Sequence, residues 1–100
     1  MVHVISIKNE LSEHYTNDSG NDLYLIIRKY FEKDEKVVVS FEGISEINSS
    51  FVNSAFVQLL ETYSLTFIME HLSFKYSNKQ INHLILSRFK FESKSKNIYA

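Results

Sequence analysis

A short apolar run near the middle of the chain most limits the folds open to it. Residues 37–41 read VVVSF, a run of strand length that is typical of a central parallel strand buried on both faces. Parallel strands need crossover connections, which are usually helices. Helical patterns flank this run on both sides, so the sequence predicts alternating strands and helices.

The first residues of the chain predict another strand of the same sheet. Residues 2–7 form a short segment rich in β-branched side chains. Alternation places Val2 and Val4 on one face of this strand and Ile5 and Ile7 on the other. With apolar side chains on both faces, the strand is expected to be covered on both sides.

A polar stretch and an amphipathic helix separate these two strands. Residues 10–20 are polar and end in turn-forming residues, which predicts a loop. The helix is expected to begin near Asn21, a suitable N-terminal cap. Its apolar side chains recur at helical spacing and form one buried stripe made of Leu23, Ile26, Ile27 and Tyr30.

The second half of the chain repeats these patterns. The helix with the clearest periodicity has as its inward-facing residues Val52, Ala55, Phe56, Leu59, Leu60 and Tyr63. Residues 65–70 fit either a short helix or a strand. We favour a helix, because residues 71–76 alternate cleanly and make the better third strand. Residues 77–80 match the S-x-x-Q capping box, which predicts the start of a last helix.

This order predicts an α/β fold, a small βαβαβα domain with a mostly parallel sheet and helices packed on it. A single domain is expected over residues 1–92, followed by a frayed basic tail at residues 93–100. The 100 residues include two Gly and no Pro, too little turn punctuation for a many-stranded all-β fold. A hydrophobic share of 44% excludes a disordered chain.

Charge is balanced in total but not along the chain. Residues 1–74 carry 5 basic and 11 acidic residues, a net charge of −6. Residues 75–100 carry six basic residues against Glu92, a net charge of +5. A basic end suits nucleic acid or an acidic partner, and equally a solvated helix surface. The candidate basic surface consists of Lys79, Arg88, Lys90 and Lys94.

Motifs for catalysis and cofactor binding are missing from the sequence. Without Cys there is no disulfide, thiolate zinc site or cysteine nucleophile. There is no glycine-rich phosphate loop, and His3, His14, His71 and His83 show no metal-ligand spacing. We therefore expect no catalytic residues, metal or cofactor. The sequence also has no transmembrane run and no signal-peptide pattern, so a cytoplasmic location is expected.

The segment most relevant to function is the polar loop at residues 42–50, where Asn48, Ser49 and Ser50 open the next helix. Free N–H groups at a helix N-terminus favour negative charge, so a phosphate on Ser49 or Ser50 would be stabilised there. Asn and Ser are also common N-terminal caps. Two interpretations therefore stay open: a capping role, and a role in recognition or phosphorylation.

Strand, Gly-containing loop, Asn48-Ser49-Ser50 and helix together resemble the STAS domain, the fold of anti-sigma-factor antagonists. The segment is still more similar to DUF4325, a STAS-like family of unknown function. The pattern of that family is a strand ending in an aspartate-containing segment, followed by a helix of the type GSSFLxEAF. Here the pattern reads SFEGI at residues 40–44 and SSFVNSAFVQL at residues 49–59. The resemblance covers roughly residues 19–90.

Several residues depart from these patterns. Asn48 replaces the acidic residue that precedes the serines in STAS domains, and Phe51 replaces the glycine that follows them. Ser40 stands where the closer family commonly has Asp, and residues 53–54 replace an acidic pair. Phe51 is expected to turn inward beneath the loop.

The resemblance implies a non-enzymatic, regulatory module for protein interaction. In STAS antagonists the partner is a histidine-kinase-like ATPase, and serine phosphorylation switches the complex off. Ser49 matches the phosphorylated position, with Ser50 beside it. The residues expected to meet the partner are Glu42, Gly43, Glu46, Asn48 and Asn53.

An alternative hypothesis from a different class stays open. The chain could be a small phage or mobile-element protein that inhibits a host defence or nucleic-acid complex through its basic C-terminal helix. Salt-dependent binding to DNA or RNA would favour this hypothesis. The oligomeric state is left open by the sequence.

Overall fold

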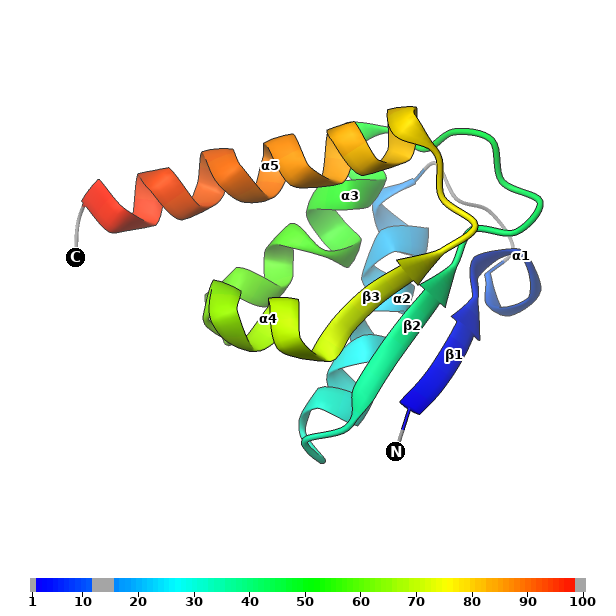
Figure 1. Cartoon of the computed structure of the whole chain (residues 1–100), viewed down its shortest axis with the longest axis horizontal. Helices are drawn as coiled ribbons and strands as arrows, with labels where there is room; N and C mark the ends of the chain where they lie inside the picture. Colours follow the sequence, from blue (N-terminus) through cyan, green and yellow to red (C-terminus); the bar gives the residue numbers. More distant parts are fainter. Residues whose placement is uncertain (1, 12–15, 99–100) are drawn as a thin grey trace.

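In the described part of the chain, three parallel strands, the helices between them and one last helix make up the domain. The computed structural model describes residues 2–11 and 16–98, with side chains described as far as residue 92. The strands lie in the order β1 (Val2–Ser6), β2 (Lys36–Ser40) and β3 (Leu72–Lys75). The helices are α1 (Ile7–Glu10), α2 (Asn17–Phe31), α3 (Ser49–Ala55), the 3-10 helix η1 (Val57–Glu61), α4 (Leu65–His71) and α5 (Lys79–Ile98). The predicted α/β class is confirmed (Figure 1).

The sheet is covered on one face, because of its strand order. Each crossover moves to the next strand in the same direction, and crossovers of one hand then lie on the same face. The covered face carries the buried Ile5 and Val39. On the opposite face, which Figure 1 views with α2 behind the sheet, Val2 and Val4 are 56% and 59% exposed and Val38 is half-buried. The prediction that both faces are covered is therefore wrong, since the covered side depends on strand order.

Aromatic side chains fill the core between the covered face of the sheet and the helices. Phe41, Phe51 and Phe56 are fully buried. The rings of Phe41 and Phe56 lie 6.5 Å apart between centroids, and those of Phe51 and Phe56 lie 6.3 Å apart, both edge to face. Phe51 thus turns inward, as the sequence predicts. Burial of each ring contributes about 1.5–3 kcal/mol to the stability of the fold. The buried rings of Phe41 and Phe51 therefore fix both ends of the segment between β2 and α3 to the core.

Helix α2 begins earlier than the sequence pattern predicts. Its first residue is Asn17, and the Thr16 hydroxyl accepts a hydrogen bond from the Ser19 N–H at 3.1 Å. Asn, Asp and Ser are common both in turns and at helix N-termini. This is why the residues that begin α2 were predicted to lie in a loop. The short helix α1 was not predicted, and it includes Ile7, expected to end the first strand, and Glu10, expected to begin the loop. Residues 12–15 of the predicted loop lie outside the described residues.

Gly20 lies inside α2 because α3 passes very close to it. A Cβ at this position would lie 2.7 Å from Ser54 Cβ and 2.8 Å from the Phe51 carbonyl oxygen. Both distances are too short for a real contact, so this glycine allows the two helices to pack together. Local sequence cannot show this, since Gly20 and Ser54 come from distant parts of the chain.

The later elements follow the predictions more closely. The helix expected through residue 63 changes at Phe56, whose φ of −116° ends α3 and leads into η1. The short helix α4 and the third strand β3 are confirmed. Helix α5 passes the predicted domain boundary at residue 92 and continues to Ile98, without a Gly or Pro to end it. Residues 99–100 lie outside the described residues.

Candidate functional site

The loop between β2 and α3 combines exposed polar residues with buried apolar ones. Ile44 and Ile47 are buried and anchor the loop to the core. The residues around them are exposed, and these are Glu42, Gly43, Ser45, Glu46 and Asn48. Four of the five residues expected to meet a partner are thus brought together at one end of the sheet.

A tight turn starts this loop. The Ile44 N–H donates to the Phe41 carbonyl at 2.9 Å, and the Glu42 N–H donates to the Ser40 hydroxyl at 3.3 Å. Gly43 between them has a φ of +82°, which glycine adopts without strain. The direction in which the chain leaves β2 is therefore set by Gly43.

Two side chains at the start of α5 hold the loop, one from the residue before the helix and one from its first turn. The Asn78 amide donates to the Ser45 carbonyl at 2.7 Å, and the Gln80 amide donates to the Ile47 carbonyl at 3.1 Å. These bonds satisfy carbonyl groups that have no strand partner, so the loop has a defined shape without regular structure. The local sequence does not predict this role of Asn78 and Gln80. The capping-box pattern predicts the start of a helix here, but it does not predict contacts with residues 33 positions away in the sequence.

Asn78, and not Ser77, caps α5. The Asn78 side-chain oxygen accepts from the Ile81 N–H at 2.9 Å, whereas the Ser77 hydroxyl donates to the Asn82 side chain at 2.8 Å. The predicted start of α5 is therefore right to within a residue, but the capping box is wrong. Asn is as good a cap as Ser, and the two are neighbours in sequence.

The start of α3 shows which of its polar residues caps the helix and which do not. The Asn48 side-chain oxygen accepts from the Phe51 N–H at 3.0 Å, so Asn48 is the cap. Ser49 and Ser50 are exposed, and neither hydroxyl forms a hydrogen bond within the described part of the chain. No acidic residue lies in this first turn. Both hydroxyls are therefore accessible at a helix end that favours negative charge.

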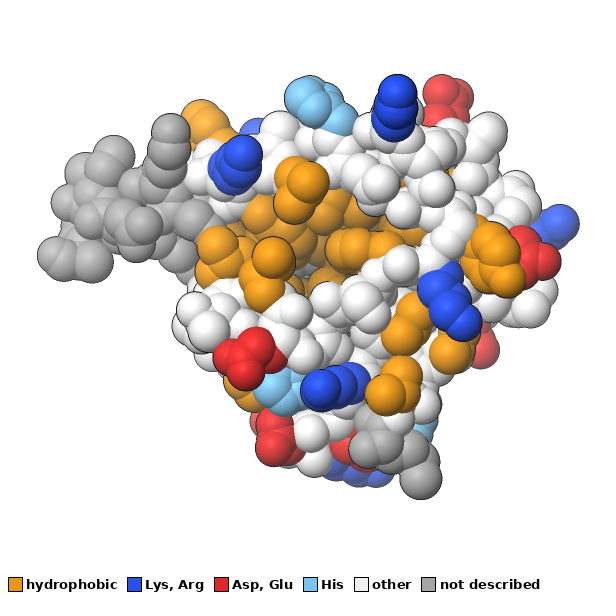
Figure 2. Space-filling model, in the orientation of Figure 1, with side chains coloured by type: hydrophobic (Ala, Val, Ile, Leu, Met, Phe, Trp, Pro, Cys, Tyr) orange, Lys and Arg blue, Asp and Glu red, His pale blue; other side chains and the backbone are white. Residues whose placement is uncertain are grey.

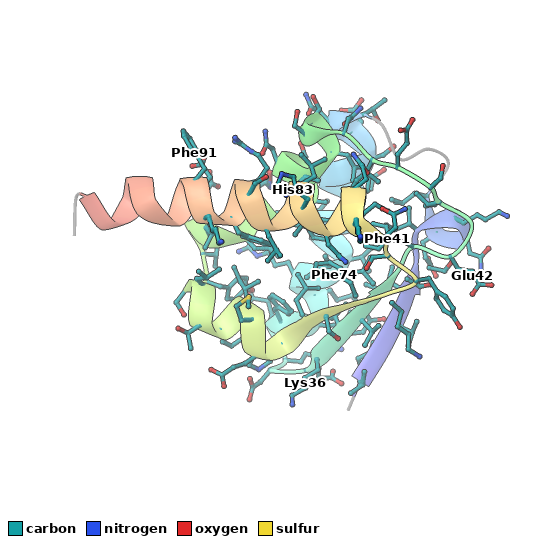
Figure 3. All side chains as sticks on the ribbon, turned by 45° about the horizontal axis from the view of Figure 1, so that its top comes forward. Lys36, Phe41, Glu42, Phe74, His83 and Phe91 are labelled. Atoms are coloured by element: carbon teal, nitrogen blue, oxygen red, sulfur yellow. The ribbon has the colours of Figure 1, made fainter. Side chains whose placement is uncertain are left out.

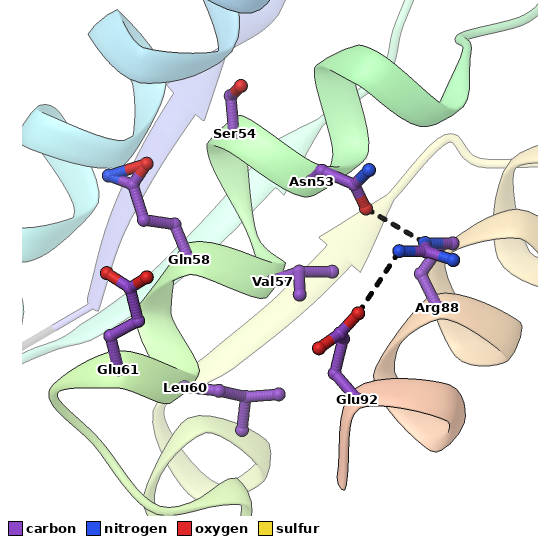
Figure 4. A pocket seen from close by; sticks show the side chains of 8 residues that line it. All are labelled: Asn53, Ser54, Val57, Gln58, Leu60, Glu61, Arg88 and Glu92. Carbon is purple, nitrogen blue, oxygen red and sulfur yellow. Dashed lines mark hydrogen bonds and ion pairs between the residues drawn. The ribbon is translucent and has the colours of Figure 1, made fainter. Parts of the chain in front are cut away.

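Asn53 lies apart from the loop, on the side of α3 that faces α5. Its side-chain oxygen accepts from Arg88 Nε at 2.8 Å, and Arg88 also forms an ion pair with Glu92 at 3.3 Å (Figure 4). These groups border a hollow of about 350 Å³ between α3, η1 and α5. Asn53 therefore joins two helices and lies apart from the four loop residues with which the prediction grouped it.

The four residues of the predicted basic surface do not share one face. Lys79 and Lys90 are exposed and eleven positions apart, which places them on nearly the same side of α5. Arg88 points to α3 and is already paired, and the side chain of Lys94 lies outside the described residues. Figure 2 shows basic and His side chains along the upper edge over α5. The alternative hypothesis thus keeps Lys79 and Lys90 as its described contact residues.

The carboxyl groups with shifted pKa lie at the other end of the strands. A hydrogen bond with His3, at 2.6 Å, lowers the pKa of Glu35 below its ordinary value. Hydrogen bonds from Arg28 and then Tyr63 lower the pKa of Glu32. The Glu35 hydrogen bond joins the turn before β2 to β1. The hydrogen bond from Tyr63 to Glu32 joins the end of α2 to the segment before α4.

Within residues 2–11 and 16–98, no group of three or more His, Asp or Glu side chains is arranged to hold a metal ion. No helix in this described part is both long and apolar enough to cross a membrane. His14 lies outside the described residues.

The fold and the loop define a small α/β domain that displays a polar loop and a helix N-terminus at one end of a parallel sheet. A family model described as a STAS-like domain of unknown function, DUF4325, matches residues 19–82, and the chain belongs to this family. The match runs from the first turn of α2 to the first turn of α5 and includes the whole candidate site. Neither the curated proteins nor the solved structures gave a match.

Proposed function

We propose that this chain is a non-enzymatic regulatory module that binds a protein partner through residues 42–50 and the first turn of α3. Phosphorylation of Ser49 would switch this contact. The observation that carries the proposal is the division of roles at the helix start. Asn48 supplies the cap, which leaves the hydroxyls of Ser49 and Ser50 exposed and without a structural task in the described chain.

The shape of the loop supports a role in recognition. Buried Ile44 and Ile47 and the hydrogen bonds from Asn78 and Gln80 hold the loop before any partner arrives. A surface that is already ordered loses less conformational entropy on binding, and so retains more of its contact energy as affinity.

The proposed switch is a local change of charge. As in STAS antagonists, the partner would be a histidine-kinase-like ATPase. The Ser49 oxygen would attack the γ-phosphorus of ATP, the hydroxyl proton would pass to a base of the kinase, and ADP would leave. The phosphate would add about −1.5 to −2 charges to an exposed surface that already carries Glu42 and Glu46. An acidic or apolar partner face would then be repelled or poorly desolvated.

Mass spectrometry of the full chain, after incubation with such an ATPase and ATP, tests this proposal. We expect a phosphate on Ser49, or on Ser50 beside it. Exposed Ser64, which caps α4, serves as the internal control and should stay unmodified. Absence of phosphate from both Ser49 and Ser50, together with no complex between the ATPase and either form of the chain, would refute the switch.

A further inference from the structure

A second surface lies away from the loop, in an apolar groove between α5 and the edge of the sheet. The groove has a volume of about 370 Å³. Figure 2 shows it as a hollow with apolar side chains on its floor and walls. The residues that matter here come from α4, β3 and α5, and they are Ile68, Met69, Phe74, Ile85, Leu86 and Phe89. Met69 and Leu86 are 62% and 50% exposed, although both are large apolar residues.

The backbone of β3 is open along the same groove. β3 is an edge strand, and no described strand pairs with its outer side. The Phe41 N–H donates to the Lys75 carbonyl at 2.9 Å, so Lys75 directs its peptide groups toward β2. Peptide groups alternate along a strand, and Phe74 therefore directs its N–H and C=O outward. An unpaired donor and acceptor beside an apolar groove is the arrangement that accepts an added strand.

Basic side chains border the groove along α5. Lys79 and Lys90 lie on this helix next to its groove-lining face, whereas Lys75, at the end of β3, lines a separate hollow beside Glu42 and Gly43. Lys79 and Lys90 are exposed, and neither forms an ion pair with a described carboxylate. Glu70, beside Met69 on α4, carries the opposite charge on the far side. The charge along the α5 side of the groove is therefore positive.

We propose that this groove binds an extended acidic segment of a protein partner. The segment adds a strand to β3, hydrogen-bonds to Phe74, and places alternate apolar side chains between α4 and α5. Its acidic residues face Lys79 and Lys90. A second copy of this chain is the poorer occupant, because pairing of two β3 edges brings two basic rims together. The surface is distinct from residues 42–50, so a partner here leaves the loop accessible.

Selection from a displayed library of random short peptides, with the full chain as bait, tests the proposal. We expect enriched peptides to alternate apolar residues with Asp or Glu. In NMR titrations they should shift the amide signals of residues 72–75 and of the groove, and protect the Phe74 amide from exchange. No enrichment, or enriched peptides that shift signals elsewhere, would overturn the proposal. So would concentration-dependent dimerisation through β3.

Matched variants separate the groove from the general surface of α5. Leu86→Asp should abolish binding of the selected peptides, whereas Phe91→Asp should leave it unchanged. Phe91 is 59% exposed on the same helix but projects away from the groove, as Figure 3 shows. Folding of both variants is checked by circular dichroism. Equal loss in the two variants would contradict the proposal.

A charge reversal tests the basic rim. The double variant Lys79→Glu/Lys90→Glu should weaken binding of the acidic peptides by about tenfold. The double variant Lys29→Glu/Lys33→Glu makes the same change in net charge on α2 and the turn after it, and should have little effect. The same loss in both double variants would show that only net charge matters, and would overturn the assignment of the rim.

Discussion

Helix α5 meets the rest of the domain in two contrasting ways. Its N-terminal end is tied to the loop by the side chains of the cap residue Asn78 and of Gln80, which donate to loop carbonyls. Its middle borders an open apolar groove beside an unpaired strand edge. The loop end is polar and held in a defined shape, whereas the groove is lined by apolar side chains, and no described strand pairs with the edge of β3 beside it. One helix thus borders an ordered polar loop at one end and an open apolar groove along its side.

The largest expected effect tests how α3 is positioned for the loop. Gly20→Ala should lower the free energy of unfolding by about 2–3 kcal/mol, because the new Cβ would meet Ser54 and the backbone of Phe51. Urea denaturation of the full chain measures this loss. Amide exchange should increase around residues 48–55 more than along β3, since α3 is the element displaced.

Gly43→Ala is the matched control for this change. Here the new Cβ would meet the flexible Lys8 side chain, so the main cost is the φ of +82°, about 1 kcal/mol. A larger loss for Gly43→Ala than for Gly20→Ala would show that the helix contact is looser than described.

The next effect tests the tie between α5 and the loop. Asn78→Ala removes the cap of α5 and the bond to the Ser45 carbonyl, and should cost about 2 kcal/mol of unfolding free energy. Ser77→Ala removes one exposed hydrogen bond and should cost about 0.5 kcal/mol or less. Chemical denaturation of both variants decides between them. A greater loss for Ser77→Ala would restore the capping box predicted from the sequence.

A smaller effect tests the division of roles at the start of α3. Asn48→Ala should cost about 1 kcal/mol, because the Phe51 N–H loses its acceptor. Ser49→Ala and Ser50→Ala should each stay within about 0.5 kcal/mol of the parent chain. Thermal and urea unfolding provide the comparison. A loss of 1 kcal/mol in either serine variant would mean that the hydroxyl has a structural task after all.

The smallest effect concerns pH, at a site outside both surfaces. Since folding lowers the pKa of Glu35, this carboxylate stabilises the fold above its unfolded pKa, which is about 4.3, and the contribution is lost as pH falls through the folded value. His3→Gln removes the ionisable hydrogen-bond partner, so the pKa of Glu35 should rise and the loss of stability in acid should become shallower. Carboxyl NMR titration measures the pKa directly. An unchanged pKa would contradict the assigned cause.

Local pattern was sufficient for the elements around the candidate site. The VVVSF run, the start of α3 at Asn48 and the inward turn of Phe51 were all predictable, because each depends on residues close in sequence. The exposure of Val2 and Val4 was not, because it depends on which face the crossovers cover. Strand order sets that face, and it is a property of the whole chain.

The same limit explains the remaining differences at the site. The charge distribution along the sequence predicts Arg88 as part of a basic surface, but its position on the helix directs it to Asn53. The helical position of Gly20 follows from its contact with α3, 34 positions away in sequence. The loop ties of Asn78 and Gln80 also join distant segments, and no local pattern contains them.

Binding of the histidine-kinase-like ATPase to three variants of the full chain tests the central claim most directly. The claim is that the loop end is an interaction surface switched by charge at Ser49 and separate from the groove. Calorimetric titration should show that Ser49→Asp weakens binding by about tenfold or more, since a charge at an interface that excludes it costs over 1.4 kcal/mol. Ser64→Asp, the same change at the cap of α4, and Leu86→Asp in the groove should leave the affinity unchanged. Equal binding by Ser49→Asp and the parent chain, or loss confined to Leu86→Asp, would contradict the claim.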